Sequence, residues 1–425
     1  MAISNSKKMK IYLHVAIPSS KENHALPTSL KKRVKRVMRT ALDWLAWGIN
    51  KTFLFKCYNY TQRAYCNRGD IAIKLAIKEL LQKGLHDVEL DFVETEWGCL
   101  NKEILADINQ NAAIFVIAGG GYWVFSKTKK LSRAFLADSP FFPKISCPIA
   151  VFGSGVNFNM PSADAVLNVH LDAELQKVFM EFDQRVNFLA VRDQLTVDFF
   201  RSLGMKKTTL LCDPAVFLEP AAMQARPSGT PISIGINLAF HGPFAAQIFK
   251  KNILFYIEFL KSVQKKFHAK FMYFVHSDEE LLIVQLLRFS GIKLEVVDQP
   301  AAELTGAYAQ LDVLLCQMMH SNILSFNVGV PALNIAYDSK NFGFNQLIGM
   351  EDYCVSAHNL DAQVLLEKMS DLIANRAALA LKLASKKKEL SFPMEAFLHE
   401  VRELALSPQS VEIESPLPSL CVKSG

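Results

Sequence analysis

The sequence predicts an α/β protein with two domains, each a parallel sheet with helices on its faces. At 425 residues, the chain is longer than one hydrophobic core usually organises. Short apolar runs alternate with segments of helical spacing, which is the pattern of βαβ units. Prolines, glycine and serine interrupt this alternation at 220–231 and indicate a linker. The predicted domains are residues 1–226 and 227–395, followed by a largely disordered tail at 396–425.

Composition and charge narrow the class of protein. Half of the residues are hydrophobic, and the basic excess behind the net charge of +6 is concentrated in residues 31–39. This local charge argues against a nucleic-acid-binding protein. The eight cysteines form neither a C-x-x-C pair nor a zinc-ligand spacing, so we expect a reduced compartment and no metal site. Without a signal peptide or an apolar run of about 18 residues, the chain is predicted to be cytoplasmic.

A basic amphipathic helix is predicted within residues 29–55. Its apolar residues share one helix face, with basic residues between them and two tryptophans near the edge. These apolar residues are Val34, Met38, Leu42, Leu45 and Ile49. Such a helix could lie on an anionic membrane surface, with residues 29–50 against the inner face of the membrane. It could instead pack on its domain and leave the basic face in solvent, which is the interpretation we favour.

In the first domain, the expected strands are short apolar runs, and the expected helices have apolar residues at spacings of three and four. Strands are expected at 10–17, 88–93, 113–118, 147–152, 188–191 and 210–212, and helices at 71–82, 102–109 and 195–203. We expect Asp70 to cap the first of these helices and Gly69 to allow a close approach to its start.

The alternation restarts after the linker. Strands are expected at 233–238, 270–276, 293–297, 313–316 and 332–337, and helices at 244–267, 279–289, 302–310, 322–328 and 364–388. In parallel sheets, ligands bind beyond the carboxyl ends of strands, where helix N-termini present unpaired N–H groups. His320 and Ser321 fall at such a point. An imidazole there could bind an anion or transfer a proton, or it could simply cap the helix.

Glycines follow two expected strands of the first domain. Gly119-Gly120-Gly121 and Gly153-Ser154-Gly155 would let the backbone approach a ligand, and two such strand ends suggest a shared cleft. Tyr122 and Trp123 would then offer flat surfaces for a sugar ring. The spacing matches neither a dinucleotide fingerprint nor a P-loop.

Arg192 and Asp193 stand directly after another expected strand. A guanidinium can hold two oxygens of a carboxylate or phosphate at once, although an Arg–Asp pair could also only brace the following helix. We expect Arg192 and His320, from opposite domains, to face a common anion-binding gap.

Seven short motifs occur in an order that resembles the polysaccharide pyruvyl transferase family. They are Asn67-x-Gly69-Asp70, Gly119-Gly120-Gly121 with Trp123, Gly153-x-Gly155, Val191-Arg192-Asp193, Leu203-Gly204, Asp213-Pro214-Ala215, and Gly329-x-Pro331 with Tyr337-Asp338-x-Lys340. The resemblance extends from Asn67 to about Tyr353, and relative to it residues 29–65 look like an insertion. It implies two Rossmann-like domains facing across a cleft in a GT-B-like fold. It also implies transfer of an enolpyruvyl group from phosphoenolpyruvate to a sugar of a polysaccharide or glycan precursor, giving a pyruvate ketal without a metal or cofactor.

The resemblance also implies roles for single residues, by acid–base and electrostatic catalysis. The expected catalytic residues are His320 as proton donor, Arg192 and Asp70. The expected contacts of the donor are Arg68, Gly120, Gly121, Ser154, Arg192, His276, Ser321 and Lys340. The expected contacts of the acceptor, a glycan or lipid-linked sugar, are Tyr122, Trp123 and Asp193.

One position departs from the family pattern. Met318-Met319-His320 stands where the family carries Arg-Leu-His, so a thioether replaces a guanidinium expected to bind the donor. Losing one such contact costs about 1.5–3 kcal/mol. Either another cation compensates or the donor has changed. The candidate cations are Arg68, Arg192, His276 and Lys340. The alternatives are a glycosyltransferase that uses a nucleotide sugar, and a non-catalytic relative that binds a glycan or a partner.

Overall fold

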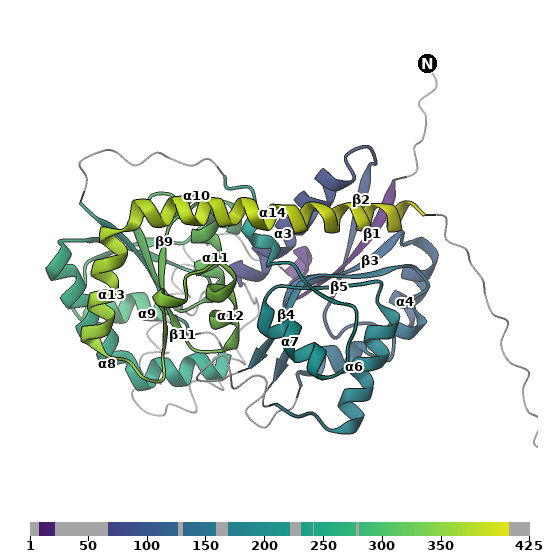
Figure 1. Ribbon diagram of the computed structural model, residues 1–425, viewed down its shortest axis with the longest axis horizontal. Coiled ribbons are helices and arrows are strands. Elements are labelled where there is room, and N and C mark those ends of the chain that lie inside the picture. Colours follow the sequence, from purple (N-terminus) through teal and green to yellow (C-terminus); the bar gives the residue numbers. More distant parts are fainter. Residues whose placement is uncertain are drawn as a thin grey trace, which may run out of the picture.

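The computed structural model describes residues 8–21, 67–125, 131–158, 169–221, 231–240, 242–277 and 280–407. Over these ranges the chain forms two six-stranded sheets, and helices cover their faces (Figure 1). Neighbouring strands within each sheet are parallel. One sheet belongs to each domain, which confirms the predicted fold class of two Rossmann-like βα domains.

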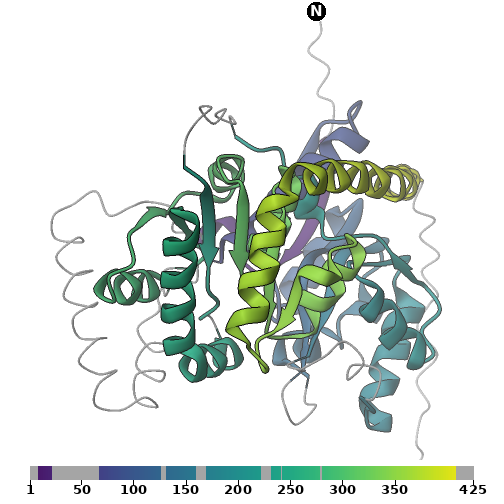
Figure 2. The same ribbon diagram turned by 60° about the vertical axis from the view of Figure 1, so that its left-hand side comes forward.

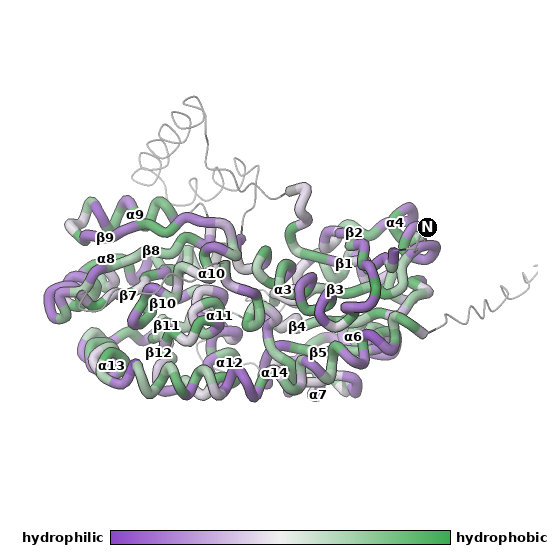
Figure 3. The backbone as a smooth tube through the Cα atoms, turned by 90° about the horizontal axis from the view of Figure 1, so that it is seen from above, coloured by the Kyte–Doolittle hydropathy of each residue, from purple (hydrophilic) through white to green (hydrophobic). Residues whose placement is uncertain are grey.

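The first sheet has the strand order β2-β1-β3-β4-β5-β6. Its strands are β1 (Met9–Val15), β2 (Leu90–Glu96), β3 (Ile114–Phe125), β4 (Ile149–Phe158), β5 (Phe188–Val191) and β6 (Thr208–Leu210). All six predicted strands are present. Helices cover both faces of the sheet, so its central strands are apolar along most of their length, as Figure 3 shows.

The second sheet has the strand order β12-β11-β10-β7-β8-β9. Its strands are β7 (Ser233–Asn237), β8 (Lys270–Phe274), β9 (Leu294–Val297), β10 (Val313–Cys316), β11 (Ala332–Ala336) and β12 (Cys354–Ser356). The strand order reverses between the adjacent strands β7 and β10. Open α/β sheets bind ligands beyond the strand ends at such a point, and His320 lies in the first turn of the helix that follows β10.

Helices and 3₁₀ turns connect the strands. In the first domain they are η1 (Ser19–Lys21), α3 (Arg68–Gly84), α4 (Lys102–Asn111), α5 (Arg133–Asp138), η2 (Phe142–Lys144), α6 (Ala173–Arg185), α7 (Gln194–Ser202) and η4 (Pro214–Phe217). In the second domain they are α8 (Gly242–Phe267), α9 (Glu280–Phe289), α10 (Ala301–Tyr308), α11 (Met319–Asn327), α12 (Ser339–Leu347), η5 (Glu351–Tyr353), α13 (Ala362–Ala374) and α14 (Arg376–Leu406). The sequence prediction misses α5, α6 and α12.

The glycine runs lie inside β3 and β4 and not beyond the strand ends, which corrects the sequence expectation. Glycine is unfavourable in a strand interior unless another backbone approaches closely. Here it does, since a Cβ on Gly119 would lie 2.8 Å from the carbonyl oxygen of Gly153. The strands therefore continue to Phe125 and Phe158, with a register shift between Gly120 and Trp123.

The start of α3 also differs from the prediction. The helix begins at Arg68, and the N-cap is Asn67, whose side-chain oxygen accepts a hydrogen bond of 3.0 Å from the backbone N–H of Gly69. Asp70 thus lies in the first helical turn and is not the cap. Asparagine serves as well as aspartate at an N-cap, so the sequence offered two adjacent candidates.

The long C-terminal helix α14 crosses both domains (Figure 1, and from another side in Figure 2). In the second domain, Lys387 donates a hydrogen bond of 2.8 Å to the carbonyl of Asn327. In the first domain, the ring of Phe397 lies 4.8 Å from that of Phe152, and Arg402 pairs with Asp87. The predicted tail at 396–425 therefore begins too early, because residues 396–406 are helical and pack on the first domain.

Several expectations fall outside the described residues. They concern the basic segment at 29–65, most of the linker at 220–231 and the final residues 408–425. Among the described helices, none combines the length and the apolar character that crossing a bilayer requires.

We expect α14 to hold the two domains together through Phe397. The Phe397→Ala substitution removes a side chain that is only 6% exposed and leaves a cavity against Phe152, so the free energy of unfolding in urea should fall by about 3 kcal/mol. Phe392→Ala on the same helix is the control, because Phe392 is 61% exposed. Equal losses in both variants would contradict this role.

Candidate active site

Helix α11 of the second domain packs directly on the first domain. Its last residue, Asn327, donates hydrogen bonds of 3.1 Å to the carbonyl of Ala215 and 2.7 Å to that of Leu218, in and just after the 3₁₀ turn η4. Its second residue, His320, lies at the other end, beside the start of α3 and the beginning of η4. The docking of α11 therefore places His320 at the boundary between the domains.

The ring of His320 rests on Gly69, in the first turn of α3. A Cβ on Gly69 would lie 2.6 Å from the Cβ of His320 and closer still to its ring Nδ1. Only glycine leaves space for this contact. The close approach that the sequence predicted at Gly69 is therefore an approach of His320 from the other domain.

Arg192 and His320 meet at a carboxylate, that of Asp213. Nη1 of Arg192 and Nε2 of His320 each lie 3.7 Å from the same Oδ2 of Asp213. These distances exceed those of N–H···O hydrogen bonds. Nε of Arg192, Nε2 of His320 and Oδ2 of Asp213 are buried and form no hydrogen bond to any described residue. Buried polar groups are normally satisfied, so these three atoms have unused capacity to bind a water or a ligand.

Arg192 is held in place by the strand next to it. Its Nη2 donates a hydrogen bond of 2.6 Å to Oδ1 of Asn157 in β4. The aliphatic part of the Arg192 side chain passes over Gly155, where a Cβ would lie 3.0 Å from Cγ of Arg192. The G-x-G motif thus provides the space in which the arginine lies, and Arg192 is only 2% exposed.

A second ion pair stands at the start of α12. Nζ of Lys340 lies 3.0 Å from Oδ2 of Asp338, the N-cap of the helix. Burial opposes the charge on Lys340, but Asp338 and Tyr337 outweigh it and hold the pKa of the ammonium group above its ordinary value. Lys340 therefore remains a cation in this partly buried position.

Helix α12 also covers Asp193 of the first domain. A Cβ on Gly343 would lie 2.9 Å from the carboxyl carbon of Asp193. Oδ1 of Asp193 accepts a hydrogen bond of 2.8 Å from the backbone N–H of Thr196, whereas Oδ2 has no hydrogen-bond partner among the described residues. Burial raises the pKa of Asp193, although Arg192 and Thr196 favour the ionised form. A carboxyl group in this state is suited to accepting a proton.

His276 and Ser321 are joined through a buried tyrosine. Nε2 of His276 lies 2.8 Å from the hydroxyl of Tyr308, which lies 2.7 Å from Oγ of Ser321. Burial, together with the charges of His320 and Arg68, holds the pKa of His276 well below its ordinary value. The charged form of His276 is thus disfavoured, which argues against His276 as the compensating cation.

Arg68 joins the two domains. Its Nε donates a hydrogen bond of 2.7 Å to the carbonyl of Gln299, and its Nη2 pairs with Asp298. Its backbone N–H also donates a hydrogen bond of 2.9 Å to the carbonyl of His276. Nε and Nη2 are therefore used in bracing, whereas Nη1 is buried and has no hydrogen-bond partner among the described residues.

Asp70 and the strand glycines lie next to one another. A Cβ on Gly120 would lie 3.5 Å from Oδ1 of Asp70. A Cβ on Gly121 would lie 3.2 Å from Cγ of Asn157. The hydroxyl of Ser154 is fully buried and donates a hydrogen bond of 3.1 Å to the carbonyl of Gly120. Ser154 thus links β3 to β4.

Tyr122 and Trp123 do not face a ligand, which corrects the expected acceptor contacts. Tyr122 is 1% exposed, and its hydroxyl donates a hydrogen bond of 2.7 Å to Asp138. Trp123 is fully buried, with its ring 4.9 Å from that of Phe200. Because β3 continues beyond its glycines, these rings belong to the hydrophobic core of the first domain.

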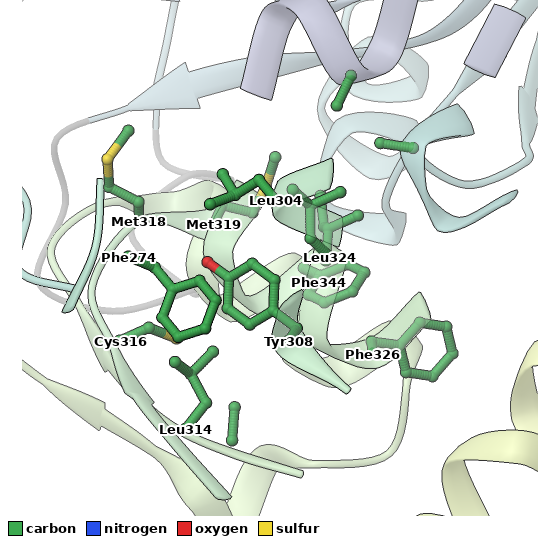
Figure 4. Packing of buried hydrophobic residues seen from close by; sticks show 14 of the residues in the cluster. Phe274, Leu304, Tyr308, Leu314, Cys316, Met318, Met319, Leu324, Phe326 and Phe344 are labelled. Atoms are coloured by element: carbon green, nitrogen blue, oxygen red, sulfur yellow. The ribbon is translucent and has the colours of Figure 1, made fainter. Parts of the chain in front are cut away.

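Met318 lies at the end of β10, within the hydrophobic cluster of Figure 4. It is 5% exposed, and its backbone N–H donates a hydrogen bond of 3.3 Å to Oδ1 of Asn237 at the end of β7. It brings no charge to the first turn of α11. Of the four candidate cations, Arg192 lies at Asp213, and Lys340 lies near enough to Arg192 for their charges to interact.

Sequence reasoning missed Asp213 and Asn157 as members of the site. Asp213 carries a signal, since it follows a strand just as Arg192 and Asp193 do. Asn157 carries none, because it stands inside β4, past the predicted strand end. Within the described residues, no three histidine, cysteine, aspartate or glutamate side chains gather as metal ligands would.

Solved structures resemble this chain at low sequence identity. A putative UDP-N-acetylglucosamine 2-epimerase from Listeria monocytogenes superposes with a TM-score of 0.51 and 11% identity, over 78% of this chain and 93% of that one. The S. aureus MnaA–UDP structure gives 0.49 and 11%, over 78% and 93%. A mutant O-GlcNAc transferase from Thermobaculum terrenum gives 0.47 and 10%, over 94% and 69%. At such identities the likeness concerns the two-domain fold alone.

Comparison by sequence identifies the family. A search of curated proteins finds no significant match. The model of the family described as polysaccharide pyruvyl transferase matches residues 67–339, a range that includes Gly69, Arg192, Asp213 and His320. The chain therefore belongs to the polysaccharide pyruvyl transferase family and is a transferase.

Proposed function

We propose that this protein transfers the enolpyruvyl group of phosphoenolpyruvate to a sugar of a glycan or lipid-linked glycan precursor and forms a pyruvate ketal. The observation that supports this most is the convergence of Arg192 and His320 on Asp213, with 3.7 Å to Oδ2 from each side. A permanent cation and a group that can transfer a proton near neutral pH thus stand at one place. Each keeps a buried nitrogen without a hydrogen-bond partner among the described residues.

In this proposal, Arg192 binds the carboxylate or the phosphate of the donor, because its planar guanidinium can hold two oxygens. Lys340 supplies a second positive charge from the opposite domain. The first turn of α11, with His320 and Ser321, adds the positive end of a helix dipole. Nη1 of Arg68 is a further donor, whereas His276 contributes as a neutral hydrogen-bonding group.

The proposed reaction balances without a cofactor or metal ion. His320 donates a proton to the methylene carbon of the donor, and an acceptor hydroxyl forms a C–O bond to the adjacent carbon. A second hydroxyl of the same sugar forms the second C–O bond at this carbon while the bond to the phosphate oxygen breaks. One hydroxyl proton restores His320, and the other leaves with the phosphate.

Asp193 is the proposed base for an acceptor hydroxyl, because its buried carboxyl group has a raised pKa and an Oδ2 without a hydrogen-bond partner among the described residues. Asp70 is the second candidate, beside Gly120 at the start of α3. The burial of Tyr122 and Trp123 removes them from the acceptor site.

A nucleotide sugar is the second candidate donor, and Met318 is the observation that favours it. The uncharged side chain removes a cation that the family pattern places directly before His320, and three carboxylates already stand beside Arg192 and Lys340. These are Asp193, Asp213 and Asp338. A donor with less negative charge at the reacting centre would fit this balance better.

A cytoplasmic location is part of the proposal, and contact of residues 29–50 with the inner face of the membrane is the alternative to the packing on the domain that we favour. This contact would bring the site to a lipid-linked acceptor. These residues lie outside the described part of the chain.

The two donors can be separated by their effect on thermal stability. We expect phosphoenolpyruvate to raise the melting temperature of the protein in proportion to the logarithm of its concentration. UDP-N-acetylglucosamine should leave it unchanged. In Arg192→Leu the shift with phosphoenolpyruvate should disappear, because the main cation is gone. A shift with the nucleotide sugar alone would instead support a glycosyltransferase.

His320 can be tested by phosphate release. With phosphoenolpyruvate and a glycan acceptor, we expect His320→Ala to lower kcat by about 10²–10⁴-fold, which is the usual contribution of a positioned acid or base. His399→Ala, an exposed histidine on α14, is the matched control and should keep full activity. Unchanged phosphate release in His320→Ala would reject the role of the imidazole.

Gly69 should control the position of His320. In Gly69→Ala the new methyl group would overlap the imidazole, so we expect kcat to fall at least 10-fold as the ring is displaced. Gly84→Ala, at the other end of α3, is the control, because its Cβ would lie 3.3 Å from a side-chain atom of Leu398. Wild-type turnover in Gly69→Ala would show that the contact with His320 is unimportant.

A further inference from the structure

Asp213 is the buried acidic residue to which both reactive groups turn, yet no step of the reaction uses it. We propose that Asp213 is a positioning residue that aligns Arg192 of the first domain with His320 of the second. The predicted effect of Asp213 on catalysis rests on the proposed function, but its effect on the placement of α11 can be tested without any substrate.

The first support is that one half of the carboxylate is immobilised. Oδ1 of Asp213 accepts a hydrogen bond of 3.1 Å from the backbone N–H of Ala215, which caps η4. Pro214 fixes the next backbone torsion and packs on Gly153, where a Cβ would lie 2.9 Å from its Cγ. With Oδ1 held and the backbone fixed, the direction of Oδ2 is determined by the first domain alone.

The second support is the position of the free half. Oδ2 lies 3.7 Å from Nη1 of Arg192 and 3.7 Å from Nε2 of His320, and Asp213 is 1% exposed. A charge in such a setting is screened little by solvent, so its attraction for both groups is strong. One oxygen thereby sets the direction of a guanidinium and an imidazole that belong to different domains.

The third support is that the same turn holds both ends of α11. Asp213 attracts His320 in the first turn, and the carbonyls of Ala215 and Leu218 accept hydrogen bonds from Asn327 at the last residue. The helix is therefore laid along η4, and Asp213 provides its N-terminal attachment. A carboxylate that only capped η4 would need no cation at Oδ2.

Asp213→Asn is the principal variant, because the amide keeps the oxygen that accepts from Ala215 and removes the charge. We expect kcat for phosphate release to fall by about 10–100-fold, as when an orienting partner of a reactive group is lost. KM for phosphoenolpyruvate should rise, because the guanidinium that binds the donor loses the carboxylate that aligns it. A residue of purely structural importance would lower kcat and leave KM unchanged.

A double-mutant cycle tests whether Asp213 acts through His320. In a His320→Ala background, we expect Asp213→Asn to lower kcat by clearly less than the 10–100-fold seen in the wild-type background, since one of the two groups that it positions is absent. An unchanged 10–100-fold loss in that background would overturn the proposal. Asp213→Ser, which can still accept from Ala215, repeats the test if the asparagine variant fails to fold.

Hydrogen–deuterium exchange gives a measurement that needs no substrate. We expect faster exchange of the first turn of α11, residues 319–322, in Asp213→Asn, and unchanged exchange in the two sheets. The matched control is Asp183→Asn in the same domain. Asp183 is likewise buried, at 4% exposed, and accepts hydrogen bonds from the backbone N–H groups of Lys206 and Lys207. Unchanged exchange at 319–322 would reject the positioning role, whereas absent turnover in the wild type would reject only the proposed donor.

Discussion

The docking of α11 along η4 is the contact on which the arrangement of the site depends. Its first turn can reach the first domain only because Gly69 has no side chain at the point where His320 lies. Its last residue, Asn327, is fixed by two carbonyls of the other domain. The contacts that fix the relative position of the domains thus lie on the same helix as His320. A change in the docking of α11 would therefore move His320 away from Arg192.

The site is built from buried charges of both signs, and their balance follows from the two-domain construction. Arg192, Asp193 and Asp213 come from the first domain, and Asp338 and Lys340 from the second. Burying each charge is costly unless an opposite charge stands nearby. Each domain therefore supplies a cation and a carboxylate of its own, and the pairs meet when the domains pack. Met318 leaves this balance without the additional guanidinium of the family pattern.

Much of the fold follows from the order of apolar runs, because a strand buried on both faces must be apolar throughout. The prediction went wrong where local preference and tertiary packing disagree. Glycine disfavours a strand, but Gly119 and Gly153 are needed where two backbones approach closely, so β3 and β4 continue past them. The end of α14 appeared to be part of a tail because its amphipathic face is divided between two domains. Phe397 finds its partner, Phe152, some 245 residues earlier in the chain.

The sequence by itself determined that Arg192 follows a strand and that His320 and Gly69 lie near helix starts, and this was enough to single out these three residues. That is possible because backbone connectivity alone brings the carboxyl ends of parallel strands to one edge of a sheet. Only the tertiary structure decided which of these side chains meet. It joined Arg192 and His320 through Asp213, turned Tyr122 and Trp123 into the core, and disfavoured the charged form of His276. Burial and distances between domains depend on packing, which no local pattern of residues encodes.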